Sequence, residues 1–263
     1  MPATVVAIGN QEGGVGKTVS TFNLAASLSR AGKNILMVDM DPQYSLTLSC
    51  GMLPDLEEYG GYNTCSLFNK NVDPLDCCFS VDSLNSTNLF IIPSSQKLAV
   101  TERKLSSVKG AYQIFKSHID TLREYFDYIF FDCPPTLAEL LISSLIAADG
   151  VIIPVIPDAL SYGVVEDILS TINEIQNGKE NQPHNRNLKI IGFIATKYNS
   201  RSQVHKDYIE LIAKEHTLLG VIPDAVSVVK GIPIGLPVVA AHPQTRAAKE
   251  YKNIAFNLLE LRL

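Results

Sequence analysis

Eight residues near the N-terminus carry the chemistry that is easiest to recognise in this chain: Gln11-Glu12-Gly13-Gly14-Val15-Gly16-Lys17-Thr18. The apolar segment Val5–Gly9 precedes them, and a segment with apolar residues at helical spacing, Phe22–Leu28, follows. This order predicts a strand, a loop and a helix. Such a loop directs backbone N–H groups and the positive end of a helix toward one point, which suits a polyphosphate. An ordinary tight turn is the alternative, and a strand-end aspartate downstream weighs against it.

Three side chains complete the predicted phosphate site. Lys17 adds a point charge, and Thr18 places a hydroxyl where it can hold Mg²⁺ that bridges two phosphates, as in P-loop proteins generally. Asp132 ends the apolar segment Tyr128–Phe131 and is the second candidate for the metal, acting through a water. We expect a nucleotide to contact Gly13, Gly14, Val15, Gly16, Lys17 and Thr18, and Mg²⁺ to be held at Thr18 and Asp132.

Short apolar segments alternate with helical stretches along the chain. The predicted strands are Val5–Gly9, Asn34–Val38, Leu89–Ile92, Tyr128–Phe131, Gly150–Val155 and Lys189–Ile194. This alternation indicates parallel strands buried on both faces. Ligands of such sheets bind beyond the carboxyl ends of the strands, where the glycine loop, Asp39 and Asp132 are all expected. The sequence therefore predicts a three-layer α/β fold, a mostly parallel twisted sheet with helices on both faces.

Composition limits the remaining possibilities. A chain of 263 residues with 46% hydrophobic content can form one large core, so we expect a single domain over residues 1–263. The five cysteines form no CxxC pair, which indicates reduced thiols rather than disulfides or a zinc site. The N-terminus does not resemble a signal peptide, and no apolar run is long enough for a membrane span. We expect a soluble, cytoplasmic protein.

Charge is segregated along the chain. Residues 1–178 carry 10 Lys+Arg against 20 Asp+Glu, a net −10, and residues 179–263 carry 12 against 7, a net +5; together they give −5. A basic C-terminal third could bind nucleic acid despite the acidic total, because a polyanion responds to the surface that faces it. An ordinary solvated surface is the alternative.

The loop departs from the common GxxxxGK[ST] pattern because residue 11 is glutamine. It resembles the deviant Walker A loop, xKGGxxK[ST], of the ParA/MinD family. The resemblance covers nearly the whole chain in order. The matching segments are Asp39–Gln43 for Walker A′, Phe131–Pro135 for Walker B, Ala147–Asp149 with Ile153–Val155 for the next strand, and Thr196–Arg201 and Val221–Pro223 for the later signatures.

The resemblance implies an ATPase with ATP and Mg²⁺ as cofactors and slow hydrolysis without a partner. ATP binding would form a sandwich homodimer that binds a surface, and an activating adaptor protein would stimulate hydrolysis and release. In this scheme Lys17 and Asp39 are catalytic: Lys17 holds the phosphates and Asp39 orients or activates the attacking water. Asp41 would link the site to the dimer interface, and Pro223 would contact the nucleotide.

One residue departs from the family pattern. The family has a lysine before the two glycines that reaches the phosphates of the other subunit, and this chain has Glu12. A carboxylate that faced a triphosphate would be repelled, so Glu12 must point elsewhere or pair with a cation. Three explanations stay open: the lysine comes from the basic C-terminal third, the dimer is weak or inactive, or residue 12 is not the natural residue. We favour the first, with Lys230, Lys206 or neither as its source.

The surface that such a dimer would bind is the next question. MinD-like relatives end in a basic amphipathic helix that lies on a membrane, whereas here a pattern typical of a core-packed final helix ends the chain, at Tyr251, Ile254, Ala255, Leu258 and Leu259. We therefore favour non-specific double-stranded DNA over membrane, with nucleoid association as in ParA-like relatives. The candidate contacts are Lys197, Arg201, Lys206, Lys230, Arg246, Lys249 and Lys252.

Several functions remain compatible with this loop. The cargo that is positioned or partitioned could be a plasmid, a chromosome or, as in the McdA-type branch that also lacks the lysine, a carboxysome. One alternative is a MinD-like membrane-binding positioning ATPase, and another is an ATP-binding scaffold with little hydrolysis. A metabolic enzyme of the same loop class, such as a relative of dethiobiotin synthetase or the nitrogenase iron protein, is a further rival. The iron protein needs cluster-ligating cysteines, and only Cys133 lies near the expected segment.

Overall fold

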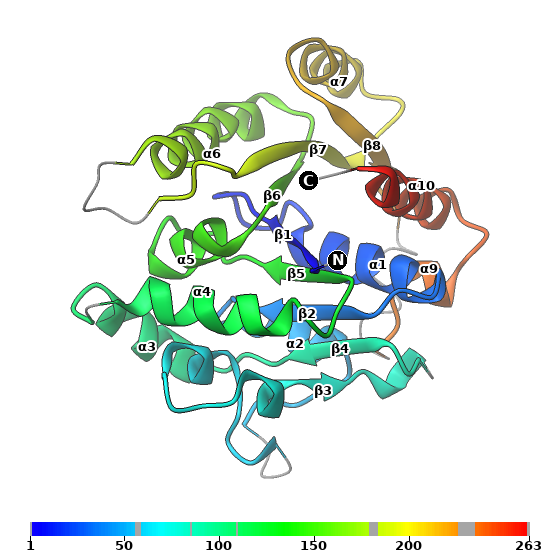
Figure 1. Cartoon of the computed structure of the whole chain (residues 1–263). Helices are drawn as coiled ribbons and strands as arrows, with labels where there is room; N and C mark the ends of the chain where they lie inside the picture. Colours follow the sequence, from blue (N-terminus) through cyan, green and yellow to red (C-terminus); the bar gives the residue numbers. More distant parts are fainter. Residues whose placement is uncertain are drawn as a thin grey trace.

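A computed structural model describes residues 2–55, 59–84, 86–108, 110–178, 184–225 and 235–261. One sheet of eight strands, in the order β3-β4-β2-β5-β1-β6-β7-β8, organises them (Figure 1). The strands are β1 Thr4–Ile8, β2 Ile35–Asp39, β3 Phe79–Ser80, β4 Leu89–Ile92, β5 Tyr128–Asp132, β6 Gly150–Val155, β7 Lys189–Tyr198 and β8 Leu218–Pro223. All pairings of these strands are parallel except that of β3 with β4.

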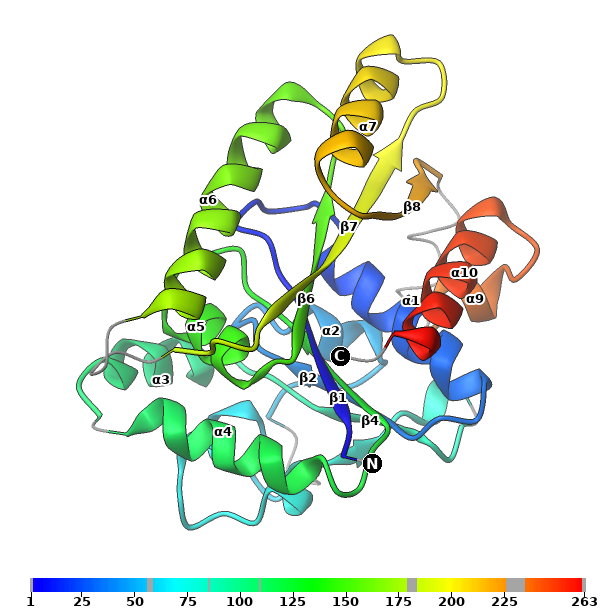
Figure 2. The same cartoon turned by 45° about the horizontal axis from the view of Figure 1, so that its top comes forward.

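Helices cover both faces of the sheet, as Figures 1 and 2 show. One face carries α3 Lys97–Leu105, α4 Ala111–Leu122, α5 Glu139–Ala147, α6 Ala159–Asn177 and α7 Gln203–Glu215. The other carries α1 Lys17–Arg30, α2 Ser45–Ser49, α9 Val238–Ala241 and α10 Arg246–Glu260. Three short 3-10 helices, η2 Thr64–Phe68, η3 Pro74–Cys77 and η4 Asp82–Leu84, lie on the chain between α2 and β4. No helix in the described ranges is long and apolar enough to cross a membrane.

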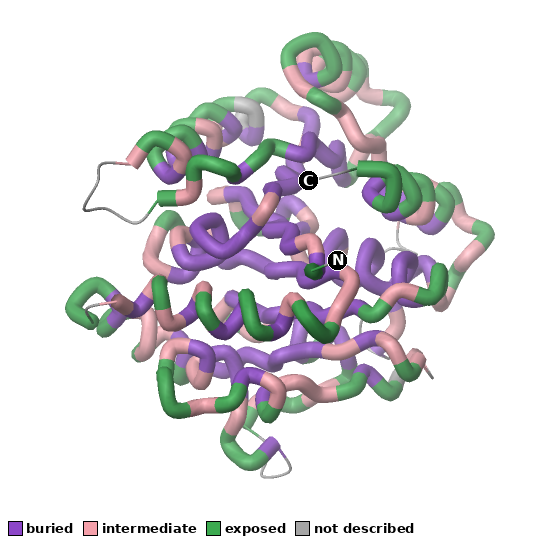
Figure 3. The backbone as a smooth tube through the Cα atoms, in the orientation of Figure 1, coloured by how far each residue is buried: buried purple, intermediate pink, exposed green. Residues whose placement is uncertain are grey.

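The central strands are apolar on both sides because both sides face a core. In β1, Val5 and Ala7 pack in the cluster under α3–α7, whereas Val6 and Ile8 pack in the cluster under α1 and α10. Successive side chains of a strand point to opposite faces, so a strand between two helical layers needs no polar face. Figure 3 shows these strands as the buried centre of the molecule.

The predicted α/β fold is confirmed, and the six predicted strands are all present within one or two residues at their starts. β7 continues four residues beyond the predicted Ile194, to Tyr198. Two edge strands were not predicted: β3, which has only two residues, and β8, whose residues are only partly buried. In the segment between α6 and β7, the structure describes residues 178 and 184–188.

The final helix packs on the core as expected. Tyr251, Ile254, Ala255 and Leu258 are buried against α1 and β8. The assignment of Leu259 to this face was wrong, since its side chain is 37% exposed. Residues 251, 254, 255 and 258 complete one helical face at i, i+3, i+4 and i+7, and Leu259 lies beside that face.

Candidate functional site

The loop between β1 and α1 is open at its tip and tightly shaped at its end. Gly13 and Gly14 are exposed, and Gly14 and Gly16 have φ values of 75° and 88°. Residues with a Cβ rarely adopt this left-handed conformation, so glycine is needed at both places. Gly16 is the N-cap of α1 and no side chain caps the helix. The first N–H groups of α1 therefore remain available to an anion.

Lys17 lies beneath the loop rather than in solvent. Its side chain is 7% exposed, and its Nζ donates a hydrogen bond of 2.7 Å to the carbonyl oxygen of Glu12. Burial lowers the pKa of the Lys17 ammonium, and the carboxyl groups of Asp132 and Asp41 oppose this shift. The ammonium thus spans the loop from its end to its beginning, where it can meet phosphates cradled by the loop.

Thr18 and Asp132 are joined as the predicted metal site requires. The Thr18 hydroxyl donates to Oδ2 of Asp132 over 2.7 Å, and the Thr21 hydroxyl lies 3.4 Å from Oδ1. Asp132 ends β5 and pairs in register with Ile8 of β1 and with Asp39 of β2. Burial and the nearby Asp39 carboxyl raise the pKa of Asp132 well above its usual value. A divalent cation would relieve this accumulation of buried acids.

Asp39 is fully buried at the end of β2 and is fixed by three donors. Oδ2 accepts from the backbone N–H and the hydroxyl of Thr47, at 2.9 and 2.7 Å, and Oδ1 accepts from the backbone N–H of Asp41 at 3.1 Å. Burial raises the pKa of Asp39 to about 7, although these hydrogen bonds oppose the shift. A carboxyl group with such a pKa can exchange a proton at neutral pH, which is the property of a general base.

Two further hydroxyls tie the Asp39 turn to the rest of the sheet, and sequence reasoning missed both along with Thr47. The Thr64 hydroxyl donates to the carbonyl oxygen of Asp39, and the Ser94 hydroxyl donates to that of Asp41, each over 2.7 Å. The backbone N–H of Ser94 also donates to the Thr47 hydroxyl. The only sequence signal was a hydroxyl residue at the end of a predicted strand, after Leu89–Ile92.

Hydrogen bonds to three distant elements, β6, α6 and β7, anchor the phosphate loop. Asn10 is buried, donates to the carbonyl oxygen of Pro154 and accepts from the backbone N–H of Glu12. Gln11 donates to the hydroxyl of Thr171 on α6, and the Thr196 hydroxyl of β7 donates to the carbonyl oxygen of Val15 over 2.8 Å. The loop is therefore held in place before any ligand arrives.

Glu12 places a negative charge near the Lys17 ammonium but forms no ion pair with it among the described residues. Its Oε2 atom is buried and has no hydrogen-bond partner among the described residues. Of the two proposed sources of a substitute lysine, Lys206 is exposed on α7, and Lys230 lies outside the described residues. Pro223 ends β8 opposite Tyr198 of β7.

Cys133 follows Asp132 but is unsuited to redox or nucleophilic chemistry. It is 1% exposed, and burial raises the pKa of its thiol to about 12. A reactive cysteine needs an accessible thiolate. All five cysteines are free thiols, and the described residues contain no group of three or more His, Cys, Asp or Glu that could hold a metal.

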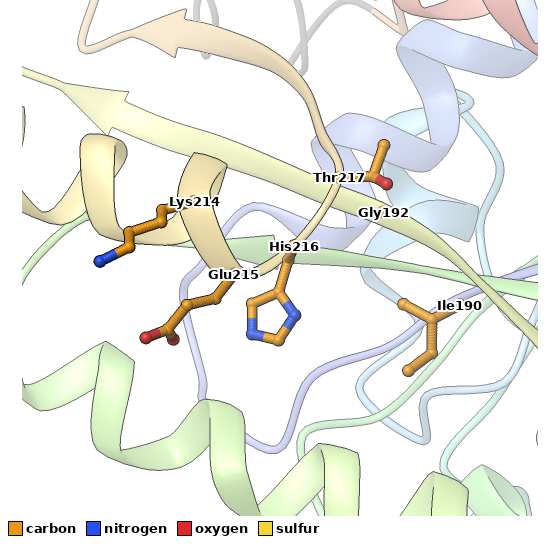
Figure 4. A pocket seen from close by; sticks show the side chains of 6 residues that line it. All are labelled: Ile190, Gly192, Lys214, Glu215, His216 and Thr217. Carbon is orange, nitrogen blue, oxygen red and sulfur yellow. The ribbon is translucent and has the colours of Figure 1, made fainter.

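A hollow of about 370 Å³ lies at the opposite edge of the sheet from the loop (Figure 4). Its lining comes from the beginning of β7 and from the turn between α7 and β8, with Ile190, Gly192, Lys214, Glu215, His216 and Thr217. The His216 ring packs on Phe193 with centroids 4.7 Å apart. This hollow contains no member of the predicted site.

Comparison with known proteins agrees with this geometry. The model of a family described as an AAA domain matches residues 3–190. The sporulation initiation inhibitor protein Soj of Bacillus subtilis is 31% identical over 254 residues, covering 95% of this chain and 96% of Soj. The chain belongs to the ParA/MinD family of P-loop ATPases.

Solved structures of similar proteins share the fold of this ParA/MinD-family chain. Cobyrinic acid a,c-diamide synthase from Mycobacterium smegmatis, with bound ADP and magnesium, has a TM-score of 0.81 and 28% identity, covering 98% of this chain and 94% of its own. An ATP complex of a Cyanothece McdA variant has a TM-score of 0.85 and 22% identity, covering 99% and 98%. ATP and Mg²⁺ are the cofactors of this family, and the residues that would hold them are in place here: the open glycine loop, Lys17 and the Thr18–Asp132 pair.

Proposed function

We propose that this protein is a nucleotide-controlled switch that binds ATP with Mg²⁺, forms a homodimer, binds DNA without sequence preference and releases it after hydrolysis. The observation that carries the proposal is the pairing of a complete phosphate loop with Asp39, a buried carboxyl group whose pKa is about 7. Soj of Treponema pallidum, named a chromosome-partitioning ATPase, is 29% identical over 253 residues and supports this class of function.

Each residue of the site has a distinct role in the proposed hydrolysis. Bound Mg²⁺ would neutralise the phosphate oxygens and favour departure of ADP. Gly13–Thr18 hold the phosphates through backbone N–H groups, Lys17 adds its ammonium, and Thr18 with Asp132 places the metal. Asp39, oriented by Thr47, accepts a proton from the attacking water. The loop tip at Gly13 and Gly14 is exposed, so the site can be completed from outside.

In this proposal a second copy of the chain covers the exposed side of the nucleotide site. The loop tip is exposed, and the apolar side chains of Leu48, Val100 and Leu137, on segments that follow β2, β4 and β5, are 44%, 45% and 53% exposed. Exposed apolar groups near the carboxyl edge suit a surface that is buried when ATP is bound. We expect Glu12→Lys to give no large gain in ATP-dependent dimerisation, and a large gain would show that Glu12 weakens the dimer.

Exposed basic residues of the C-terminal third form the proposed DNA surface. Arg201 lies in the turn between β7 and α7, Lys206 lies on α7, and Arg246 and Lys249 are exposed on α10; Lys197, at the end of β7, faces the phosphate loop instead. α7 and α10 flank the β7–β8 edge of the sheet from opposite faces (Figure 2). Together with the half-buried Lys252 they could neutralise several phosphates, while the described chain offers no helix-turn-helix for base reading.

Binding to random-sequence duplex DNA with Mg-ATP, with Mg-ADP and without nucleotide, over a salt series, tests the switch. We expect binding with ATP alone and a decline in log K with log salt of about 0.9 per phosphate contacted. Lys249→Glu should weaken binding, and Lys70→Glu, at an exposed position between η2 and η3, is the control with the same charge change. Equal binding in all three nucleotide states would contradict the switch, and no binding in any would favour a membrane surface or a scaffold that does not turn over ATP.

In this proposal the adaptor protein, rather than the nucleotide site, determines which cargo is positioned. Plasmid, chromosome and carboxysome positioning all fit the proposal, and the likeness to McdA at 22% identity concerns the fold alone. Affinity capture by the ATP-bound protein, compared with the ADP-bound protein, would identify an adaptor that raises the rate of hydrolysis. A cytoplasmic, nucleoid-associated distribution that disperses when ATP hydrolysis is stimulated is the expected behaviour.

A second candidate function rests on the 28% identity to a cobyrinic acid a,c-diamide synthase that the chain nearly spans. ATP-dependent amide formation would use the same loop for a different phosphoryl transfer. ATP turnover that rises with cobyrinic acid and ammonia, and not with DNA, would favour this candidate.

A further inference from the structure

Lys197 brings an exposed ammonium to the tip of the phosphate loop. A Cβ built on Gly14 would lie 3.9 Å from the Lys197 Nζ, and that Nζ is among the atoms nearest to it. Residues 14 and 197 are far apart in the sequence, and the pairing of β6 with both β1 and β7 brings their segments together. Among the described residues, no hydrogen bond or ion pair occupies this ammonium.

The backbone at Lys197 is shaped to aim this side chain. Its φ is 49°, one of three positive values among described residues other than glycine. The β7–β8 pairing shifts register between Ala195 and Tyr198, which is a β-bulge around this residue. Bulges redirect side chains, and strained conformations of this kind persist where the surrounding structure holds them. Glycine or asparagine would adopt this conformation at lower cost, yet lysine is present.

Neighbouring residues fix the bulge on both sides. The Thr196 hydroxyl donates to the carbonyl oxygens of Val15 and Val155, at 2.8 and 3.2 Å, so the residue before Lys197 is bonded directly to the loop. On the other side, the Asp224 N–H donates to the Tyr198 carbonyl oxygen, and the Asn199 N–H donates to Nδ1 of His205. The backbone at Lys197 is therefore held beside the phosphate loop by the fold, within reach of the loop tip for its side chain.

The charges around this ammonium call for an anion. Lys17 is buried under the same loop, the uncapped N-terminus of α1 points into it, and both repel a further cation. Glu12 is near in sequence, but its buried Oε2 has no hydrogen-bond partner among the described residues and is not paired with Lys197. A polyphosphate in the loop would attract Lys17, the N-terminus of α1 and Lys197 alike, and so would offset their mutual repulsion.

We propose that Lys197 is a second phosphate-binding cation, supplied by the same subunit from the bulge of β7, and that it substitutes for the positive charge that Glu12 removes from the loop. This inference rests on the proposed nucleotide-binding function. It replaces the expectation that the C-terminal third delivers this lysine from the other subunit. The ammonium is thus available to a monomer, before any dimer forms.

The test measures the affinities of Mg-ATP, Mg-ADP and inorganic tripolyphosphate, by competition with a fluorescent ADP analogue, for the wild type and three variants. Lys197→Gly removes the charge and suits the positive φ, Lys197→Arg keeps the charge, and Lys189→Ala removes an exposed lysine at the other end of the same strand. Thermal melting without nucleotide reports folding separately.

We expect Lys197→Gly to melt at the same or a higher temperature than the wild type and to bind ATP and tripolyphosphate about tenfold more weakly, as loss of a charge-assisted contact predicts. The loss should shrink at high salt, Lys197→Arg should restore most of the affinity, and Lys189→Ala should match the wild type. Unchanged affinity in Lys197→Gly, or a loss for ATP without a loss for tripolyphosphate, would overturn the inference. A wild type that binds none of the three ligands would instead refute the proposed function.

Discussion

Aspartates lie at both ends of the parallel strands, which we call the carboxyl edge and the amino edge of the sheet, and their surroundings differ. At the carboxyl edge, Asp39 and Asp132 are buried side by side on β2 and β5, and burial raises the pKa of both. At the amino edge, Asp149 precedes β6 and pairs with Arg123, whose two terminal nitrogens lie 2.6 and 3.0 Å from its carboxylate oxygens. The Asp149 carboxylate also accepts from the backbone N–H of Val5 over 2.7 Å.

The difference shows where this fold is stabilised and where it is prepared for a ligand. Arg123 also donates to the carbonyl oxygens of Ala3 and Ala147, and its Nε lies 3.3 Å from a carboxylate oxygen of Asp120 without a hydrogen bond, so the charges at the amino edge are matched within the chain. At the carboxyl edge the acids exceed the one buried cation, Lys17. Ligand-binding sites commonly lower the stability of a fold in this way. A charged group that is fully paired within the fold has no hydrogen-bonding capacity free for a ligand.

The hollow at the amino edge fits the same division. Gly192 lies so close to the Thr217 carbonyl oxygen that an added Cβ would be 2.5 Å from it, and His216 packs on Phe193. In Figure 4, Lys214 and Glu215 point away from Ile190 rather than converging with it on one centre. This hollow is shaped by close packing of β7 on the α7–β8 turn, whereas the loop at the other edge is shaped by unsatisfied N–H groups and charges.

The largest expected effect separates catalysis from stability at Asp39. Asp39→Asn should lower single-turnover ATP hydrolysis about 100- to 10,000-fold, because an amide cannot accept the proton of the attacking water. ATP affinity should change little, since Asp39 is bonded to Thr47 and Asp41 rather than to the loop. Asp149→Asn is the control at the other edge and should reduce stability without reducing hydrolysis by the folded fraction. Hydrolysis at the wild-type rate in Asp39→Asn would remove this residue from the mechanism.

The pH dependence of stability should also distinguish the edges. Burial raises the pKa of Asp39 in the folded state from its usual value near 3.8 to about 7, so the unfolded chain loses this proton at lower pH than the folded protein. The fold therefore has its full stability below about pH 4 and loses about 4 kcal/mol of it as pH rises through 7. Urea unfolding of the nucleotide-free protein from pH 4 to 8 should show a smaller decline in Asp39→Asn than in the wild type. Identical profiles would show that Asp39 is ionised in the fold without penalty.

A change at the amino edge should affect stability alone. Arg123→Met should lower the free energy of unfolding by about 2–3 kcal/mol, because Asp149 and two carbonyl oxygens lose their donor in a partly buried place. Nucleotide affinity should stay the same. Lys116→Met, which breaks the exposed pair with Asp120, is the control and should cost less than about 1 kcal/mol. A reduced ATP affinity in Arg123→Met would mean that the two edges are coupled.

The smallest effect concerns the metal site. Thr18→Val keeps the shape of the side chain but removes the hydroxyl that donates to Asp132, and we expect the Mg²⁺-dependent part of ATP affinity to fall about tenfold. Affinity measured in EDTA should change much less. Thr21→Val, which removes the longer contact to the same carboxyl group, should have a weaker effect. Equal losses with and without Mg²⁺ would indicate that Thr18 supports the loop rather than the metal.

Local patterns in the sequence were enough to predict the central strands and the phosphate loop. β1, β2, β5 and β6 each contain a continuous apolar run because both of their faces are buried, and a run of this kind is visible without any tertiary information. The edge strands were not visible, since β3 is two residues long and β8 is only partly buried. An edge strand that is short or only partly buried has no long apolar run, so its sequence shows little pattern.

The residues expected to bind phosphate and metal could be predicted from the sequence, because the glycines, Lys17 and Thr18 are adjacent in one loop and strand-end aspartates mark the same end of a parallel sheet. The surroundings of these residues could not be predicted, because they depend on the tertiary structure. Thr18 meets Asp132 across 114 residues and Thr196 meets Val15 across 181, distances over which no local pattern carries information. Strand order β2-β5-β1-β6-β7 brings Asp39 beside Asp132 and carries Lys197 to the loop tip. The physical reason is that burial and hydrogen bonding, which set the pKa values and orientations of these groups, arise only when the sheet assembles.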